Sequence, residues 1–258
     1  MTEAKKTSWF YRLIKFWVKF FSPKYEINGI ENVPEGGCVI VGNHCHMYGP
    51  IAAELYAPGL HYTWCAGEMM NSADVADYAY RDFWSGKPAA VRWFYRMLSY
   101  LITPLAVCIF NNANTIGVYH DARIIGTFRE TAEKLAAGAN VVIFPERDVR
   151  YNNVVYEFQD KFIDIARTYR QKEGKDLAFV PMYVSPGLKR IIYGKPSYYD
   201  PKAPGKTERK RVSRELMESI TQMAASLPVH TVIPYPNMAG KYYPQSLPLE
   251  YYDEKTES

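Results

Sequence analysis

A short apolar run followed by two histidines constrains this chain more than any other feature. Residues 38–42 read CVIVG, and the next four residues are Asn43, His44, Cys45 and His46. An apolar run of this length predicts a strand that is buried on both faces, as in sheets covered by helices on both sides. The polar residues therefore follow the carboxyl end of a buried strand, where α/β proteins hold their ligands and reacting groups.

The rest of the chain predicts alternating strands and helices. With 258 residues, of which 48% are hydrophobic, it has enough apolar material for one domain core. We expect a single three-layer α/β domain, with a mixed central sheet flanked by helices and preceded by an N-terminal amphipathic helix. Gly49 is the expected N-cap of the first helix of this domain, with Pro50 in the first turn. The expected strands are 38–42, 61–65, 105–110, 115–119, 141–144 and 177–184, and the expected helices are 50–56, 74–100, 124–137, 157–169 and 208–227.

The amphipathic helix is expected within residues 1–22. At 100° per residue, Arg12, Lys15 and Lys19 fall in one narrow stripe. Aromatic bulk beside a basic stripe suits the lipid interface, where rings lie at headgroup depth. The alternative is a helix that packs on the domain with its cations solvated. The apolar positions that cover the remaining arc are Trp9, Phe10, Leu13, Phe16, Trp17, Phe20 and Phe21.

Charge and cysteine content limit the partners and the compartment. The net charge of +4 is too small for the basic surface of a nucleic-acid-binding protein, and it suits anionic lipid or an acidic carrier. The four cysteines show no metal or redox spacing, which favours a reducing, cytosolic setting. The apolar stretches 9–21 and 97–110 are shorter than the roughly 20 residues of a spanning helix. We expect a peripheral protein on the cytoplasmic side of the membrane, with its domain at 23–227 and an extended Pro- and Tyr-rich tail at 228–258.

His44 is the candidate general base. An imidazole can accept the proton of an alcohol that attacks an acyl thioester, although a histidine at this place can also be purely structural. Cys45 and His46 are residue types that bind zinc, but no second Cys or His pair has the spacing of a tetrahedral site, so we expect no metal. Cys45 is either a nucleophile or, more commonly for such a cysteine, a small apolar filler.

The pair Asn43-His44 resembles the first motif of the glycerophospholipid acyltransferase family, whose members esterify lysophosphatidic acid and related acceptors. In that family the histidine is the general base, and an aspartate five residues later holds the imidazole in its productive tautomer. Here Gly49 occupies the position of that aspartate. The resemblance implies that His44 is catalytic and that Asn43 belongs to the substrate site.

Residues 141–150 (VVIFPERDVR) resemble the third motif of the same family through Phe-Pro-Glu and then depart from it. The resemblance implies that Glu146 or Asp148 lies beside His44 and supplies the missing carboxylate. The family arginine that holds the phosphate of the acceptor is replaced by a valine, so Arg147 or Arg150 is the candidate for this contact. The alternative is a solvated loop with local ion pairs.

Two weaker matches complete the resemblance, which covers roughly residues 26–225. Arg123 stands six residues after Gly117, as in the second motif, and is a further candidate phosphate ligand. Pro181, in the run 179–184, matches the fourth motif, which lines the acyl side of the site in the family.

The resemblance therefore implies an O-acyltransferase of phospholipid biosynthesis. It would move a fatty acyl group from acyl-CoA or acyl carrier protein, as cosubstrate and without a bound cofactor, to a hydroxyl of a glycerophospholipid-type acceptor. Two alternatives stay open: a non-catalytic member that binds lipid or acyl carrier, and a hydrolase of lipid esters or thioesters.

Overall fold

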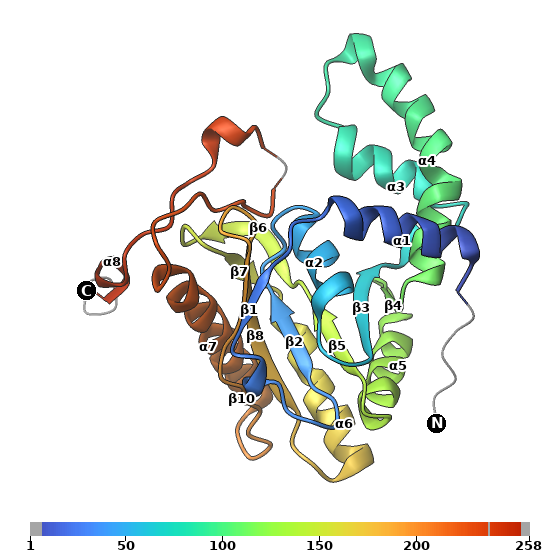
Figure 1. Ribbon diagram of the computed structural model, residues 1–258. Coiled ribbons are helices and arrows are strands. Elements are labelled where there is room, and N and C mark those ends of the chain that lie inside the picture. The colour runs from blue at the N-terminus through green and yellow to red at the C-terminus, as the bar shows by residue number, and fades with distance from the viewer. Residues whose placement is uncertain (1–6, 237, 254–258) are drawn as a thin grey trace. The chain divides into compact units, whose positions relative to one another are not determined.

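The protein folds into two compact units, seen here in a computed structural model that describes residues 7–236 and 238–253. Unit 1 comprises Met1–Ser22 and Tyr62–Thr131, and unit 2 comprises Pro23–His61 and Ala132–Ser258 (Figure 1). A single domain over 23–227 stays a prediction. The contacts group the chain into these two units, and each unit is described by itself.

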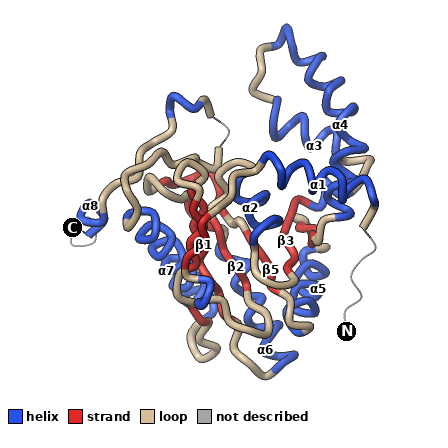
Figure 2. The backbone as a smooth tube through the Cα atoms, viewed as in Figure 1, coloured by secondary structure: helices blue, strands red, loops and turns tan. Residues whose placement is uncertain are grey.

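Unit 2 is built on a sheet of strands with helices beside it, in agreement with the predicted α/β class (Figure 2), and the strand directions make this sheet a mixed one. Three strands run parallel in the order β8, β2 and β5, β9 is antiparallel to β8, and β1 is parallel to β9. The short strand β10 is antiparallel to β8. The bounds are β1 Glu26–Asn28, β2 Val39–Gly42, β5 Asn140–Ile143, β8 Ala178–Ser185, β9 Arg190–Tyr193 and β10 Ser197–Tyr198.

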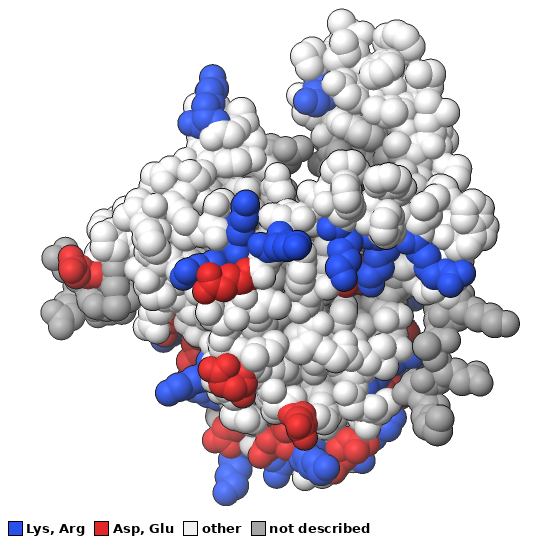
Figure 3. Space-filling model, viewed as in Figure 1, with Lys and Arg blue, Asp and Glu red and all other residues white. Residues whose placement is uncertain are grey.

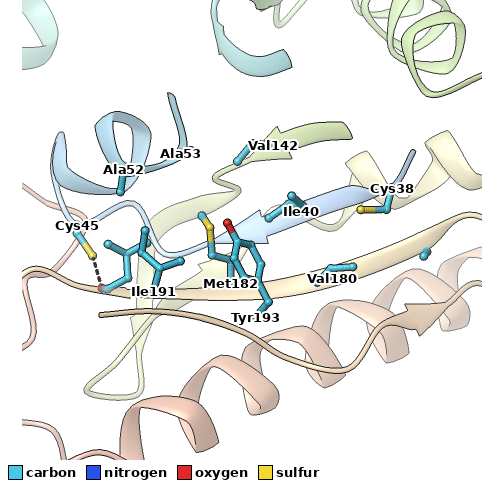
Figure 4. Close-up of a cluster of buried hydrophobic side chains, with 12 residues drawn as sticks. Cys38, Ile40, Cys45, Ala52, Ala53, Val142, Val180, Met182, Ile191 and Tyr193 are labelled. Atoms are coloured by element: carbon cyan, nitrogen blue, oxygen red, sulfur yellow. Dashed lines mark hydrogen bonds between the residues drawn. The ribbon is translucent and has the colours of Figure 1, made fainter. Parts of the chain in front are cut away.

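Helices cover both faces of this sheet, which gives unit 2 the three layers predicted. On one face, alternate residues of β2 and β8 pack against helix α2 (Tyr48–Tyr56) through Ala52 and Ala53 (Figure 4). On the other face, Phe179 of β8 meets Phe162 edge to face, with ring centroids 6.0 Å apart, a separation typical of aromatic pairs. The elements of that second layer are η5 (Asp160–Asp164), α6 (Ile165–Glu173) and α7 (Gly205–Ala225).

The parallel strands bring three chain segments to one edge. Val41 of β2 lies opposite Ile143 of β5, and Gly42 lies opposite Met182 of β8. Because parallel strands share a direction, the residues that follow β2 and β5 leave the sheet at the same carboxyl edge. The two motif blocks therefore meet there, as the resemblance implies.

A hairpin replaces part of a predicted helix. We expected a helix over 157–169, but β6 (Glu146–Tyr151) pairs with β7 (Tyr156–Phe158), and helix α6 begins only at Ile165. Phe158 repeats at helical spacing with later apolar residues, yet it lies on a strand and is buried. Periodicity alone does not separate a short strand followed by helical turns from one continuous helix.

Unit 1 combines a two-stranded parallel pair with helices. Its strands are β3 (His61–Ala66) and β4 (Thr115–Val118), and the N-terminal helix α1 (Trp9–Phe21) forms as predicted. The other elements are η2 (Gly67–Met70), α3 (Val75–Ala79), the π-helical turn η3 (Tyr80–Trp84), η4 (Ala89–Val91), α4 (Arg92–Asn112) and the start of α5 (Ile124–Ala136).

The predicted strand 105–110 is wrong, because these residues belong to α4, which continues through Pro104. Ser99 and Ala106 are buried on one side of this helix, and its many apolar residues hide the helical period. Among the described residues, the segment Ala89–Asn112 is the one helix whose length and composition would allow it to cross a membrane. We expected this stretch to be too short for a membrane-spanning helix. With 24 residues, the helical segment is long enough for one.

The C-terminal segment of unit 2 folds back on itself, whereas we expected an extended tail. Thr231 and Gln245 form a bridge, and the N–H of Ser246 donates to the carbonyl of His230 at 2.8 Å. The buried His230 ring also contacts Tyr183 Oη at 2.7 Å and thus fastens the segment to β8. It contains the turn η6 (Gly240–Tyr242) and the short helix α8 (Leu249–Asp253).

Candidate active site

The turn after β2 has an unusual backbone. Cys45 and His46 both adopt left-handed conformations, with φ of 46° and 53°. Such a conformation costs a residue with a side chain roughly 1–2 kcal/mol, so strain is concentrated next to the candidate base. The turn also moves the start of α2: it begins at Tyr48, with Met47 as N-cap. The predicted cap at Gly49 is therefore wrong, because Gly49 lies inside the helix.

Gly49 has no room for a side chain. A Cβ atom at this position would lie 2.5 Å from the carbonyl oxygen of Asn43, 2.7 Å from that of His44 and 3.0 Å from the Phe144 ring. Two of these three contacts are to rigid backbone. With this turn, the aspartate of the family motif cannot occupy position 49.

Asn43 joins the ends of two strands. Its side chain is buried, with Oδ1 accepting from the Val184 N–H at 2.8 Å and Nδ2 donating to the Val184 carbonyl at 3.1 Å. Nδ2 also contacts the sulfur of Cys45 at 2.6 Å. These bonds close the gap between β2 and β8 and explain an asparagine here in structural terms. Substrate binding by Asn43 stays a prediction.

Cys45 is an apolar filler and not a nucleophile. Its thiol is buried and lies 3.3 Å from the Val184 carbonyl, to which it donates. Burial, with the carboxylate of Glu146 nearby, holds the pKa of the thiol well above its usual value. Because the thiolate is the reactive form, this cysteine stays unreactive at neutral pH.

Glu146 binds the backbone of the histidine turn. The side chain is 4% exposed; Oε1 accepts the His44 N–H at 2.6 Å, and Oε2 accepts the Tyr156 N–H at 2.8 Å. Burial raises the pKa of Glu146 to about 7, although both hydrogen bonds favour the charged form. Its carboxylate therefore positions His44 through the main chain, whereas we expected it to face the imidazole.

The ring of His44 lies between aromatic side chains. Phe144 and Tyr235 each meet it edge to face, with centroids 5.4 Å away. Its Nδ1 atom is buried and has no hydrogen-bond partner within residues 7–236 and 238–253. Burial is the main cause that lowers the pKa of His44 to about 4, so the ring is neutral at neutral pH. Neither Glu146 nor Asp148 supplies Nδ1 with the expected carboxylate, which corrects that prediction.

The arginine block forms a bulge on β6 and not the loop we expected. Five residue steps separate Glu146 from Tyr151, but only two separate their partners Phe158 and Tyr156, so the residues 147–150 bulge out and are all exposed. Arg147 forms an ion pair with Glu157. In the described part of the chain Arg150 has no ion pair or hydrogen bond, and Asp148 is exposed on the same bulge.

The last two candidates are Arg123 and Pro181. Arg123 belongs to unit 1, where its guanidinium binds Asp121 at 2.7–3.0 Å and lies 3.9 Å from the centroid of the Tyr119 ring. These hydrogen bonds lower the pKa of Asp121 to about 2. Pro181 is buried in the middle of β8, opposite Val41. The acceptor and acyl roles of both residues stay predictions.

The C-terminal segment also contacts the histidine turn, which the sequence did not indicate beyond its density of Pro and Tyr. His46 Nε2 donates to the Pro236 carbonyl at 3.0 Å, and Tyr243 Oη lies 3.4 Å from His46 Nδ1. Together with Tyr235 on the His44 ring, these contacts place part of the segment over both histidines. No group of three or more His, Cys, Asp or Glu side chains that could hold a metal is found in the described residues.

Comparisons with known proteins leave the family open. No family model matches this chain, and no curated protein sequence matches it. Among solved structures, the 1-acyl-sn-glycerophosphate (LPA) acyltransferase PlsC of Thermotoga maritima is similar, with 17% identity and a TM-score of 0.46 over 84% of this chain and 81% of that chain. Similarity of this degree assigns no activity to the chain.

Proposed function

We propose that this protein transfers a fatty acyl group from an acyl thioester of coenzyme A or acyl carrier protein to a hydroxyl of a glycerophospholipid-type acceptor. The observation that carries the proposal is the 2.6 Å hydrogen bond from the His44 N–H to Glu146. It joins the two sequence blocks that resemble the acyltransferase family at the carboxyl edge of a parallel sheet. The proposal rests on that resemblance and this geometry together.

The chemistry needs a neutral imidazole. His44 accepts the hydroxyl proton as the acceptor oxygen attacks the thioester carbonyl; the carbon–sulfur bond then breaks, and the leaving thiolate takes a proton back from the imidazolium. The low pKa of His44 keeps the ring in its basic form at neutral pH, although it also makes the ring a weak base. Glu146 holds the backbone of the base, so the ring position depends on it.

Arg150 is the arginine best placed to bind a phosphate on the acceptor. It is exposed on the β6 bulge, whereas Arg147 is neutralised by Glu157 and Arg123 by Asp121. A free guanidinium can form two parallel hydrogen bonds to phosphate. The proposal requires no resident cofactor or metal.

A second candidate function is binding of lipid or acyl carrier without catalysis. The observation in its favour is the buried Nδ1 of His44, which has no partner in the described residues. In the described residues no carboxylate contacts Nδ1 to fix the tautomer, and loss of such a carboxylate costs about 10⁴ in rate in the serine-protease triad. This factor belongs to the serine-protease triad and gives the order of magnitude of such an effect, not the rate of this protein.

The test is incubation of the full chain with radiolabelled acyl-CoA or acyl carrier protein and a panel of lyso-lipids. We expect acyl transfer by the wild type and none by His44→Ala. His61→Ala is the matched control, because His61 is a histidine at the start of β3. The neighbouring Leu60 carbonyl accepts the N–H of Asn140, which lies at the end of β5 opposite to the candidate site. Donor binding without turnover would support the second candidate, and donor consumption without acceptor would indicate a hydrolase.

The cytoplasmic, peripheral location is also a proposal. The apolar positions of α1 that we identified from the sequence are exposed in the structure, and its inward residue is Tyr11. An exposed aromatic face next to a basic stripe favours contact with an anionic membrane surface.

A further inference from the structure

Helix α4 presents a second exposed apolar face. Trp93 is 69% exposed, Leu101 66% and Tyr100 58%. At 100° per residue, all large exposed hydrophobic residues of α4 fall within one arc of about 140°. A solvent-facing helix surface normally carries polar residues at such positions. The exposed residues are Trp93, Phe94, Met97, Tyr100, Leu101 and Leu105.

The opposite side of α4 is already occupied. Ala106 packs with Val75 and Met69 in a small buried cluster, and the Tyr95 ring lies 5.7 Å from that of Trp84. These contacts join α4 to α3 and η3 as a helical hairpin within unit 1. The exposed arc is therefore a surface that the hairpin leaves without a partner in the described structure, and not its inner face.

Helix α1 is attached to this hairpin and repeats its pattern. The N–H of Ser8, the N-cap of α1, donates to Asn112 Oδ1 at the end of α4, at 2.8 Å. The exposed residues of α1 also share an arc of about 140°. Figure 3 shows basic side chains along one edge of α1, beside a surface almost free of charge. These exposed residues are Trp9, Phe10, Leu13, Phe16, Trp17, Phe20 and Phe21.

We propose that the exposed faces of α1 and α4 together form a membrane-binding surface for an anionic lipid bilayer, with α4 inserted into one leaflet rather than crossing it. This goes beyond the proposed activity and beyond the contact through α1, because it assigns lipid binding to an internal helix.

Geometry argues against a span. If α4 crossed the bilayer, the chain before it would have to cross in the opposite direction through α3 and η3. Those helical elements cover residues 75–84, which reach about 15 Å at 1.5 Å per residue, half of the roughly 30 Å hydrocarbon core. The residues at 71–74 and 85–88 on either side of them are not helical, and the polar backbone groups of such segments would lack hydrogen-bond partners in lipid. A hairpin with both ends on one side of the membrane fits these lengths.

Charge argues for lipid over a second copy of this chain. Residues 9–21 contain three basic and no acidic residues, and residues 92–112 contain two basic and no acidic residues. Two copies that met through these faces would bring like charges together, whereas anionic headgroups attract them. Six of the seven exposed apolar residues of α1 and three of the six of α4 are aromatic, and Trp and Tyr are the residues favoured at headgroup depth.

The test is co-sedimentation of the full chain with vesicles of phosphatidylcholine, with and without phosphatidylglycerol. The α4 variant is Trp93→Ser/Tyr100→Ser/Leu101→Ser, and the α1 variant is Trp9→Ser/Phe16→Ser/Phe20→Ser. Ile125→Ser is the matched control, because Ile125 is 73% exposed on α5 of unit 1 but lies outside both faces. Every substituted side chain is exposed, so circular dichroism should show unchanged folding.

We expect wild-type binding to anionic vesicles, a loss of about tenfold or more for each triple variant, and no change for the control. The proposal would be overturned if the α4 variant bound anionic vesicles as well as the wild type does. The proposal would also be overturned if the wild type formed an oligomer without lipid and the α4 substitutions dissociated that oligomer. The face would then bind a second copy of this chain. Labelling of Gly86→Cys, in the turn before α4, by an impermeant maleimide enclosed in the vesicles would indicate a span, and absence of this labelling supports leaflet insertion. None of these readouts requires acyltransferase activity.

Discussion

Glu146 and His44 should give the protein two pH dependences of stability that oppose each other. Burial raises the pKa of Glu146 from 4.5 to about 7 and is the main cause that lowers the pKa of His44 from 6.5 to about 4. Each shift is about 2.5 pH units, or about 3 kcal/mol at 1.36 kcal/mol per unit. Both groups are largely buried, so solvent screening reduces this figure little.

The signs follow from which state binds more protons. For Glu146 the folded state holds its proton more tightly, so its contribution is complete below pH 4.5 and is lost as the pH rises through 7. For His44 the unfolded state binds the proton more tightly, so its contribution is complete above pH 6.5 and is lost as the pH falls through 4. Between about pH 4.5 and 6.5 the two nearly cancel in the wild type.

Substitution of one of the two groups should reveal the pH dependence of stability that the other contributes. Relative to the wild type, Glu146→Gln should gain about 3 kcal/mol in free energy of unfolding from pH 4 to pH 8, and His44→Asn should lose about as much. Val149→Ser, a neutral change on the β6 bulge, is the control and should follow the wild-type curve.

The measurement is urea unfolding at a series of pH values, followed by circular dichroism. All five tryptophans lie in unit 1, so circular dichroism, which follows both units, is the signal of choice. If both variants keep the wild-type pH dependence, the two groups do not titrate as buried residues, and the reasoning about the site is wrong.

Three further variants probe the same edge. Asn43→Ala leaves the backbone of Val184 unpaired and should lower the free energy of unfolding by roughly 3 kcal/mol in urea. Gly49→Asp should destabilise by about 3 kcal/mol by overpacking and should not raise acyl transfer; higher activity would mean that the turn can reshape. Arg150→Ala should raise the KM for a phosphate-bearing acceptor about tenfold or more in steady-state assays, and Arg147→Ala much less; equal KM values would favour a neutral acceptor.

The parts of the fold that could be predicted are those with a strong local signal. The buried strand at β2 and the helix α7 match their apolar patterns, because burial on two faces or along one helix face selects the residue types directly. The β6–β7 hairpin could not be predicted in this way. Its bulge is four exposed residues long, and the N–H of Tyr156 on β7 donates to the Glu146 side chain on β6, a contact that no local pattern records.

The candidate site shows the same division. The sequence placed His44 at the strand end and brought the Phe-Pro-Glu block to the same edge, which the structure confirms for Glu146. It did not predict that Glu146 binds the backbone, since a carboxylate beside a histidine suggests a contact with the ring. Nor did it predict Tyr235 against His44, because that contact joins residues 191 positions apart through the folding of the C-terminal segment.

The glycine at position 49 and the missing carboxylate have one structural cause. Left-handed Cys45 and His46 turn the chain so tightly that the N–H of Gly49 donates to the His44 carbonyl at 3.1 Å. That contact leaves no space for a Cβ, so a turn of this shape excludes an aspartate at position 49. The orientation of the imidazole then depends on the backbone bond to Glu146 and on the edges of two aromatic rings. Ring packing and a bond to the main chain keep the base in its place but do not fix its tautomer. The chemical step of any acyl transfer by this protein should therefore be slow, and its rate should be sensitive to substitution of Tyr235.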